Sequence, residues 1–312
     1  MTTFPTTERR DTKSATVGEI VKQALGEPAS SIFQVPEQGN VNTSYFVDTR
    51  SGSFVVRVRF DRDEMRQFEV EKRCAELIRV EHDWTPAIVA IGRYGPHCYS
   101  IQERVRGIVA SDYQGNLLDI WEQVGRYSRH FHRIRTAGYL SDLFTAPRDP
   151  SRPWCQHYFD GLGRPEDAKL VKLGRMTPGD FERGLIALEP LKQLTFEPTL
   201  AHGNLTLKNI VVEASGKAHI IDWGTCQGHL ATELDISELL VFQTPRESLM
   251  AYLRGHGLPV DYIEQNSELL DRLRLARLFT TANWLCEIDS PRGEDLSNYL
   301  AGTSAALKRF NV

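Results

Sequence analysis

Long apolar runs and paired cysteines are both missing from this chain of 312 residues. No stretch of 18 apolar residues is present for a membrane helix, and no charged start precedes an apolar core of the kind found in secretion signals. The five cysteines are scattered, odd in number and form no Cys-x-x-Cys pair, which disfavours a disulfide framework and a metal cluster. These absences favour a protein with reduced thiols in the cytoplasm.

A basic tract is also missing. The formal net charge is −4, which argues against nucleic acid as the main partner. Residues 231–312 carry 12 acidic and 8 basic side chains, so the negative excess lies in the last third of the chain. This excess suits a cationic substrate, although solvated helix faces are the more common cause of such a pattern.

The length is typical of two domains or two lobes. Residues 1–14 are polar and offer nothing to bury, which predicts a disordered tail, and apolar residues at helical spacing predict a short helix over 17–25. The next part of the chain alternates strand-like runs with turns that carry Gly and Asn. The predicted elements are strands at 31–35, 44–48 and 54–60, a helix at 63–80, and strands at 88–94 and 98–103.

Beyond Gly107 the composition becomes helical. Predicted helices cover 117–134, 178–194, 236–242, 246–255, 267–287 and 295–310. The chain is therefore predicted to be α+β, with a small antiparallel-sheet lobe that carries one main helix and a larger, mostly helical lobe.

A polar pair marks the ends of a predicted hairpin in the second half of the chain. Two β-branched runs, 210–212 and 218–221, flank Ala214-Ser215-Gly216, a pattern typical of a hairpin. Asn209 precedes the first strand and Asp222 ends the second, so antiparallel pairing brings these positions close together. Both side chains can offer oxygen to Mg²⁺, which takes one or two such protein ligands in phosphoryl-transfer sites.

The same stretch begins with His202-Gly203-Asn204, five residues before Asn209. His-Gly-x-x-x-x-x-Asn followed by a strand ending in Ile-Asp-Trp resembles the aminoglycoside phosphotransferase and choline kinase-like family, whose fold is similar to that of protein kinases. The resemblance implies that Asn209 and Asp222 hold the metal. It also implies a catalytic base at position 204, where the family has Asp and this chain has Asn204.

The resemblance implies a nucleotide site in the first lobe. Its turn 38–42 would cover the ATP phosphates, with Asn40 and Asn42 among its residues, although one glycine makes this motif weak. Arg57 occupies the position of the family's phosphate-contacting cation, and strand alternation alone does not separate it from Arg59. Glu71 matches the helix glutamate that pairs with this cation, with Glu69 and Glu76 as rivals.

The resemblance also places a hinge at 104–107, between a nucleotide-binding lobe at 15–103 and a catalytic and substrate-binding lobe at 108–312. Main-chain groups near Glu103 and Val105 would read the adenine edge, so that ATP rather than GTP is an expectation only. His132 is predicted to be a packing and hydrogen-bonding residue, and Asp235 is predicted to stabilise the loop around Asp222.

Asn204 changes the expected chemistry, because an amide cannot accept a proton at neutral pH. Three interpretations stay open: a slow kinase, an engineered Asp→Asn trap, and a nucleotide-binding pseudokinase with a binding or regulatory role. If position 204 plays no part as a base, His229 is the next candidate. The preferred interpretation is a kinase that moves the γ-phosphate of ATP to a hydroxyl of a small molecule, of the antibiotic or amino-sugar and amino-alcohol type, with Mg²⁺.

Overall fold

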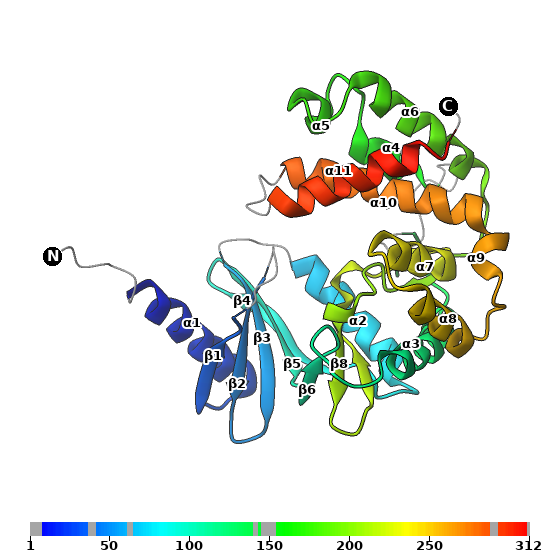
Figure 1. The fold of residues 1–312 in the computed structure, drawn as a ribbon. Coiled ribbons are helices and arrows are strands. Elements are labelled where there is room, and N and C mark those ends of the chain that lie inside the picture. The colour runs from blue at the N-terminus through cyan, green and yellow to red at the C-terminus, as the bar shows by residue number, and fades with distance from the viewer. Residues whose placement is uncertain are drawn as a thin grey trace. The chain divides into compact units, whose positions relative to one another are not determined.

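The computed structural model describes residues 8–36, 42–60, 65–139, 143–144, 154–287 and 293–310. The chain divides into two compact units, which we call the sheet unit and the helical unit (Figure 1). The sheet unit comprises Met1–Tyr113 with Lys208–Thr225, and the helical unit comprises Gln114–Leu207 with Cys226–Val312. Within the described ranges, no helix is long and apolar enough to cross a membrane.

The sheet unit follows the predicted order of elements. Its first part contains α1 (Glu8–Leu25), β1 (Ser31–Gln34), β2 (Thr43–Asp48), β3 (Ser53–Arg59), α2 (Met65–Arg79), β4 (Ile88–Tyr94) and β5 (His97–Glu103). Its second part contains β6 (Gly107–Val109), β8 (Ile210–Glu213), β9 (Ala218–Ile220) and two 3-10 turns, η2 (Leu207–Asn209) and η3 (Trp223–Thr225).

Five strands form an antiparallel sheet in the order β1-β2-β3-β5-β4, so β3 lies at its centre. On β2, Tyr45 and Val47 are buried and alternate with half-buried neighbours, as expected of a strand with one face on the core. Val17, Ile20 and Val21 of α1 pack against the same core. The predicted antiparallel lobe with one main helix, α2, is therefore confirmed.

Helix α1 begins earlier than the sequence analysis predicted. Residues 8–14, assigned to a disordered tail, are helical, and residues 1–7 lie outside the described part. Glu, Arg and Lys favour helix, so these residues extend a helix whose later turns are anchored in the core. The Lys13 ammonium lies 4.8 Å from the ring centroid of Phe60, which ties this extension to the sheet.

A second sheet has the order β6-β8-β9. The hairpin predicted from the β-branched runs is present as β8 and β9, with Ile210 opposite Ile220. Strand β6 pairs with β8, and Gly107 allows this pairing because a Cβ there would lie 2.4 Å from the Val212 carbonyl oxygen. This pairing joins residues 108–109 and 208–225 to the sheet unit, although the predicted lobe boundary placed them after the hinge.

The helical unit contains nine described α-helices and one small strand pair. The helices are α3 (Leu117–Phe131), α4 (Gln156–Leu162), α5 (Lys169–Lys172), α6 (Pro178–Leu188), α7 (Ala231–Val241), α8 (Arg246–His256), α9 (Tyr262–Gln265), α10 (Ser267–Glu287) and α11 (Gly293–Leu307). The 3-10 helix η1 (Glu189–Gln193) follows α6, and β7 (Thr199–Ala201) pairs with β10 (Gln227–His229).

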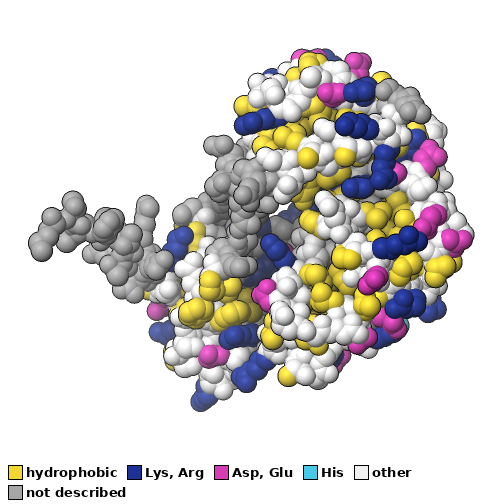
Figure 2. Space-filling model, viewed as in Figure 1, with side chains coloured by type: hydrophobic (Ala, Val, Ile, Leu, Met, Phe, Trp, Pro, Cys, Tyr) yellow, Lys and Arg dark blue, Asp and Glu magenta, His cyan; other side chains and the backbone are white. Residues whose placement is uncertain are grey.

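Helix α10 forms the centre of the helical unit's main core, where Phe279 contacts Phe181 of α6. The helix predicted at 178–194 stops at Leu188 and continues as η1, because Pro190 cannot extend an α-helical ladder. On the face shown in Figure 2, the acidic and basic side chains of the described residues are interspersed over this unit.

Candidate active site

A buried arginine of β3 joins two carboxylates in the sheet unit. Arg57 donates from Nη1 to Glu71 Oε1 at 2.5 Å and from Nη2 to Asp222 Oδ1 at 3.0 Å. Burial by itself would lower the pKa of Arg57, but the two carboxylates outweigh burial and raise this pKa, so the guanidinium stays charged. Glu71 is 1% exposed, whereas its rivals Glu69 and Glu76 are exposed. The pairing of Arg57 with Glu71 that the resemblance implied is present.

Burial has the largest influence on Glu71 and raises the pKa of its carboxyl group, while the Arg57 charge opposes this rise. The Glu71 carboxylate is therefore stable in its charged form only while Arg57 is paired with it. The two ion pairs hold the Arg57 guanidinium in one orientation, between α2 and the residue that follows β9.

The hairpin end brings Asn209 and Asp222 to neighbouring positions. The Ile221 N–H donates to the Asn209 carbonyl oxygen at 2.9 Å, and Asp222 follows directly. Asp222 has φ +63°, a conformation that is uncommon for a residue other than glycine and that occurs often at functional sites. One Asp222 oxygen accepts from Arg57, yet 40% of the side chain remains exposed. Carboxylate and amide oxygens at this position suit a magnesium ion.

The predicted phosphate turn is described only at its end. Asn40 lies outside the described residues, and Asn42 lies directly before β2. The Asn42 Oδ1 accepts from Arg59 Nε at 2.8 Å. The two arginines that strand alternation could not separate therefore have different partners, because Arg57 contacts carboxylates and Arg59 contacts amides.

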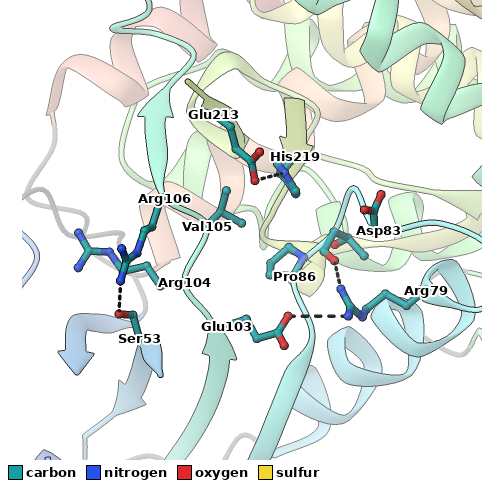
Figure 3. Close-up of a pocket in the computed structure, with 11 residues that line it drawn as sticks. Ser53, Arg79, Asp83, Pro86, Glu103, Arg104, Val105, Arg106, Glu213 and His219 are labelled. Carbon is teal, nitrogen blue, oxygen red and sulfur yellow. Dashed lines mark hydrogen bonds and ion pairs between the residues drawn. The ribbon is translucent and has the colours of Figure 1, made fainter. Parts of the chain in front are cut away.

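The segment predicted as a hinge crosses a hollow of about 460 Å³ within the sheet unit (Figure 3). Glu103 and Val105 line this hollow, whereas Arg57, Glu71 and Asp222 do not. The Glu103 N–H donates to the Ala87 carbonyl oxygen at 2.9 Å, so this N–H is already used. Of the predicted nucleotide contacts that the structure describes, the hollow therefore includes the hinge residues and none of the phosphate contacts.

The charged side chains around the hollow are paired with one another or with close neighbours. Glu213 lies 2.9 Å from His219, Arg79 lies 3.8 Å from Glu103, and Arg106 lies 3.3 Å from Ser53. Dashed lines mark these three contacts in Figure 3. Two other lining residues find partners outside it, since Asp83 pairs with Lys217 and Arg104 stacks on Phe46. Of these contacts, Arg79–Glu103 joins α2 to the end of β5, and the contacts of Arg104 and Arg106 join the hinge segment to β2 and β3.

In the helical unit, a buried carboxylate holds the turn that carries Asn204. Asp235 accepts from the His202 N–H at 3.0 Å and from the Gly203 N–H at 2.8 Å. Gly203 has φ +72°, which favours glycine at this position. Asp235 was predicted to stabilise the loop around Asp222, and this prediction is wrong about the loop. Its structural role is on the His202–Gly203 turn, because helix α7 presents it to these two amides.

A histidine pair completes the surroundings of Asp235. His132 Nε2 lies 2.9 Å from Asp235 Oδ2, and His132 Nδ1 lies 3.0 Å from His256 Nε2. Burial by itself would raise the pKa of Asp235, but the hydrogen bonds that it accepts outweigh burial and lower this pKa. An ionised carboxylate only accepts, so His132 Nε2 is the donor. The predicted packing and hydrogen-bonding role of His132 is confirmed.

A sequence profile of the phosphotransferase enzyme family matches residues 32–274. The chain belongs to this family. No curated protein matches it by sequence.

Solved structures place this phosphotransferase in the protein kinase-like fold. A thermostable mutant of aminoglycoside phosphotransferase APH(4)-Ia, in a ternary complex with ADP and hygromycin B, has a TM-score of 0.69 at 12% identity and covers 95% of this chain and 99% of its own. A chain from Haemophilus somnus 129PT assigned as a fructosamine-3-kinase has a TM-score of 0.65 at 15% identity, with 94% and 96% covered. Spectinomycin phosphotransferase APH(9)-Ia, with ADP and spectinomycin, has a TM-score of 0.59 at 13% identity, with 94% and 96% covered.

These comparisons confirm the predicted family and the predicted fold, a small antiparallel-sheet lobe followed by a mostly helical lobe. They leave the roles of the individual site residues as predictions. The identities are so low that the structural likeness establishes the fold alone, and it does not transfer any substrate to this phosphotransferase.

His229 is excluded as an alternative base in this phosphotransferase. Its side chain is fully buried on β10, with Nε2 3.2 Å from the Tyr158 hydroxyl and the ring packed edge-on against Trp154. Burial lowers the pKa of His229 to about 3. A substrate hydroxyl therefore cannot reach this imidazole. Trp154 and Tyr158 belong to the core of the helical unit and anchor their segment.

Glu238 gives the helical unit a predicted pH dependence. Its carboxyl group is fully buried, and Glu238 Oε1 lies 2.9 Å from Arg277 Nε. Burial raises the pKa of Glu238 from an ordinary value of 4.5 to about 7. Between these two values the folded state binds a proton that the unfolded state has lost, so stability is full below pH 4.5 and falls as the pH rises through 7. Relative to Glu238→Gln, the wild type should lose about 3 kcal/mol of unfolding free energy over this interval.

Urea unfolding of both proteins at pH 4.5 and pH 7.5 measures this difference, and exposed Glu264→Gln on α9 serves as the matched control. We expect the control to follow the wild type at both pH values. If the difference in unfolding free energy between the wild type and Glu238→Gln stays constant with pH, the prediction of a raised pKa for Glu238 is wrong.

Proposed function

We propose that this phosphotransferase moves the γ-phosphate of ATP to a hydroxyl of a small molecule, with Mg²⁺ as the metal. The single observation that supports this proposal most strongly is the buried Arg57 held between Glu71 and Asp222. A guanidinium fixed in this way can contact the α- and β-phosphates with a defined orientation. An ordinary structural ion pair between Arg57 and Glu71 would not require a second, half-exposed carboxylate with a left-handed backbone, which Asp222 supplies.

In this proposal each residue has one task. Asn209 and Asp222 hold the metal, which when bound neutralises charge on the phosphate oxygens. Asn40 and Asn42 belong to the turn over the phosphates, and main-chain groups at Glu103 and Val105 receive the adenine edge. Asn204 accepts or donates a hydrogen bond at the substrate hydroxyl and so orients it, without taking its proton.

The acceptor is proposed to be of the antibiotic or amino-sugar and amino-alcohol type. Related folds carry hygromycin B or spectinomycin, and both of those complexes also hold ADP. The 12 acidic against 8 basic side chains of residues 231–312 suit a cationic acceptor. The compartment proposed for this activity is the cytoplasm.

The first measurement is nucleotide binding by isothermal titration. We expect ATP to bind in the presence of millimolar Mg²⁺, and we expect Asp222→Asn to bind it at least tenfold more weakly, because one metal ligand loses its charge. Without Mg²⁺, the affinities of the wild type and of Asp222→Asn for ATP should differ much less. If the wild type shows no affinity for ATP at millimolar Mg²⁺, the proposed site is wrong.

A second candidate function is a nucleotide-binding protein without catalysis, which the amide at position 204 favours. Single-turnover reactions with labelled ATP and a panel of hydroxyl compounds separate the two functions. The kinase transfers label to at least one compound, whereas the binding protein holds ATP and transfers none. An acceptor that takes the label also identifies the substrate class.

A further inference from the structure

A second chain of contacts runs parallel to the Arg57–Glu71 pair. On β3, Arg57 and Arg59 are two residues apart and share a face, and on α2, Gln67 and Glu71 are four residues apart and share a face. Two strand residues span about 6.6 Å and one helical turn spans about 6 Å, so both pairs can meet at once. Glu71 contacts Arg57, and Gln67 contacts Arg59 through its Oε1.

The second pair extends in both directions. Arg59 is 1% exposed and donates from Nε to Asn42 Oδ1 at 2.8 Å, at the end of the proposed phosphate turn. Gln67 donates from Nε2 to the Gly224 carbonyl oxygen at 2.9 Å, two residues beyond Asp222. The contacts therefore form one chain, Asn42–Arg59–Gln67–Gly224, which joins the two segments proposed to hold phosphate and metal.

The chemistry of Gln67 is specific to this arrangement. A guanidinium can only donate and a carbonyl oxygen can only accept, so the residue between Arg59 and Gly224 must accept on one side and donate on the other. A primary amide does both. A carboxylate at this position would still accept from Arg59 but would face the Gly224 carbonyl oxygen with no proton to share.

Close packing at Gly224 supports the same assignment. A Cβ at Gly224 would lie 2.7 Å from Gln67 Nε2, so the amide reaches the carbonyl only because no side chain intervenes. Phe68, the next residue of α2, is fully buried, and its ring centroid lies 5.4 Å from the guanidinium carbon of Arg59 and 5.7 Å from that of Arg57. The two arginines therefore pack on one aromatic ring.

We propose that Gln67 is a positioning residue, which fixes the Asp222–Gly224 segment for the metal and couples it through Arg59 to Asn42 at the phosphate turn. This inference rests on the proposed function. It predicts that Gln67 acts on Mg²⁺-dependent nucleotide affinity without touching the nucleotide.

Gln67→Glu tests this inference, because it keeps the size of the side chain and its contact with Arg59 while it removes the donation to Gly224. In the absence of nucleotide, we expect hydrogen exchange at the amides of residues 222–225 to become at least tenfold faster, as judged by mass spectrometry of the intact chain. The affinity for ADP with Mg²⁺ should fall at least tenfold, and the affinity for ADP without Mg²⁺ should change less than threefold. The melting temperature should stay within a few degrees of the wild type.

Gly224→Ala displaces Gln67 Nε2 from the carbonyl oxygen of residue 224 and should accelerate hydrogen exchange at the same amides. This second variant keeps the test decisive if Gln67→Glu folds poorly. Exposed Glu69→Gln on the same helix is the control and should leave exchange and affinity unchanged. Wild-type exchange at residues 222–225 in both variants would overturn the inference. Failure of the wild type to bind ADP would instead remove the proposed function, while the exchange result would still decide whether Gln67 holds the segment.

Discussion

Asn204→Asp should raise the rate of phosphoryl transfer by about 10²-fold, within the range of about 10² to 10⁴ that general-base assistance supplies. The carboxylate can accept the proton of the substrate hydroxyl as the bond to phosphorus forms, whereas the amide can only orient that hydroxyl. The turn is held by the hydrogen bonds that the His202 and Gly203 N–H groups donate to Asp235, and by the Gly203 φ of +72°. Neither feature involves the side chain at 204. The substitution should therefore leave the turn in place.

Single-turnover rates with saturating ATP and Mg²⁺ measure this effect on the acceptor that the compound panel identifies. Exposed Asn116→Asp, at the N-cap of α3, is the matched control, because Asp and Asn cap helices equally well and the change in charge is the same. We expect the control to keep the wild-type rate. An unchanged rate in Asn204→Asp would mean that transfer needs no base at this position, and the fully buried His229 could not supply one.

Asp235→Asn should lower the unfolding free energy by about 4 kcal/mol, as expected when one partner of a buried, charged hydrogen-bond network is lost. Asp235 is fully buried and accepts from His202 N–H, Gly203 N–H and His132 Nε2. An amide of the same shape must turn its NH₂ group toward one of these donors, so at least one buried N–H loses its acceptor. Transfer activity should fall with stability, because the turn that carries Asn204 loses its support.

Equilibrium unfolding in urea at pH 7.5 measures the change in stability, with Asp261→Asn at the exposed start of α9 as the control. The control should remain within about 0.5 kcal/mol of the wild type. Wild-type stability of Asp235→Asn would show that the hydrogen bonds of the Asp235 carboxylate do not contribute to the unfolding free energy, and the prediction would be wrong.

Local patterns predicted much of the sheet unit. The hairpin at 210–221 was recognisable because β-branched runs flank a Gly-containing turn, and both features act over a few residues. Helices α2, α8 and α10 were predicted within two residues of their described bounds, because their apolar spacing is regular. The helical structure of residues 8–14 was not predicted, because a charged helical extension leaves no apolar pattern. The end of α6 at Leu188 was not predicted either, because the apolar spacing continues past Pro190 although the α-helix does not.

Partners across the fold were harder to predict. Alternation placed Arg57 and Arg59 on one face of β3 and could not assign their partners, which depend on the register between β3 and α2. Asp235 was expected to act on the Asp222 loop because residues 228–235 resemble a segment of the family, yet helix α7 directs it to the amides at 202 and 203. The contact of Gln67 with Gly224 joins residues 157 positions apart, and no local signal marks it.

The sequence by itself determined the order of the main strands and helices and the residue types that can bind phosphate and metal, because both follow from local spacing and side-chain chemistry. Only the tertiary structure decided which of two equivalent arginines contacts Glu71, which amide bridges to the metal segment and which histidine is shut away from solvent. The physical reason is that hydrogen bonds between distant segments depend on register and burial, which arise only when the whole unit packs.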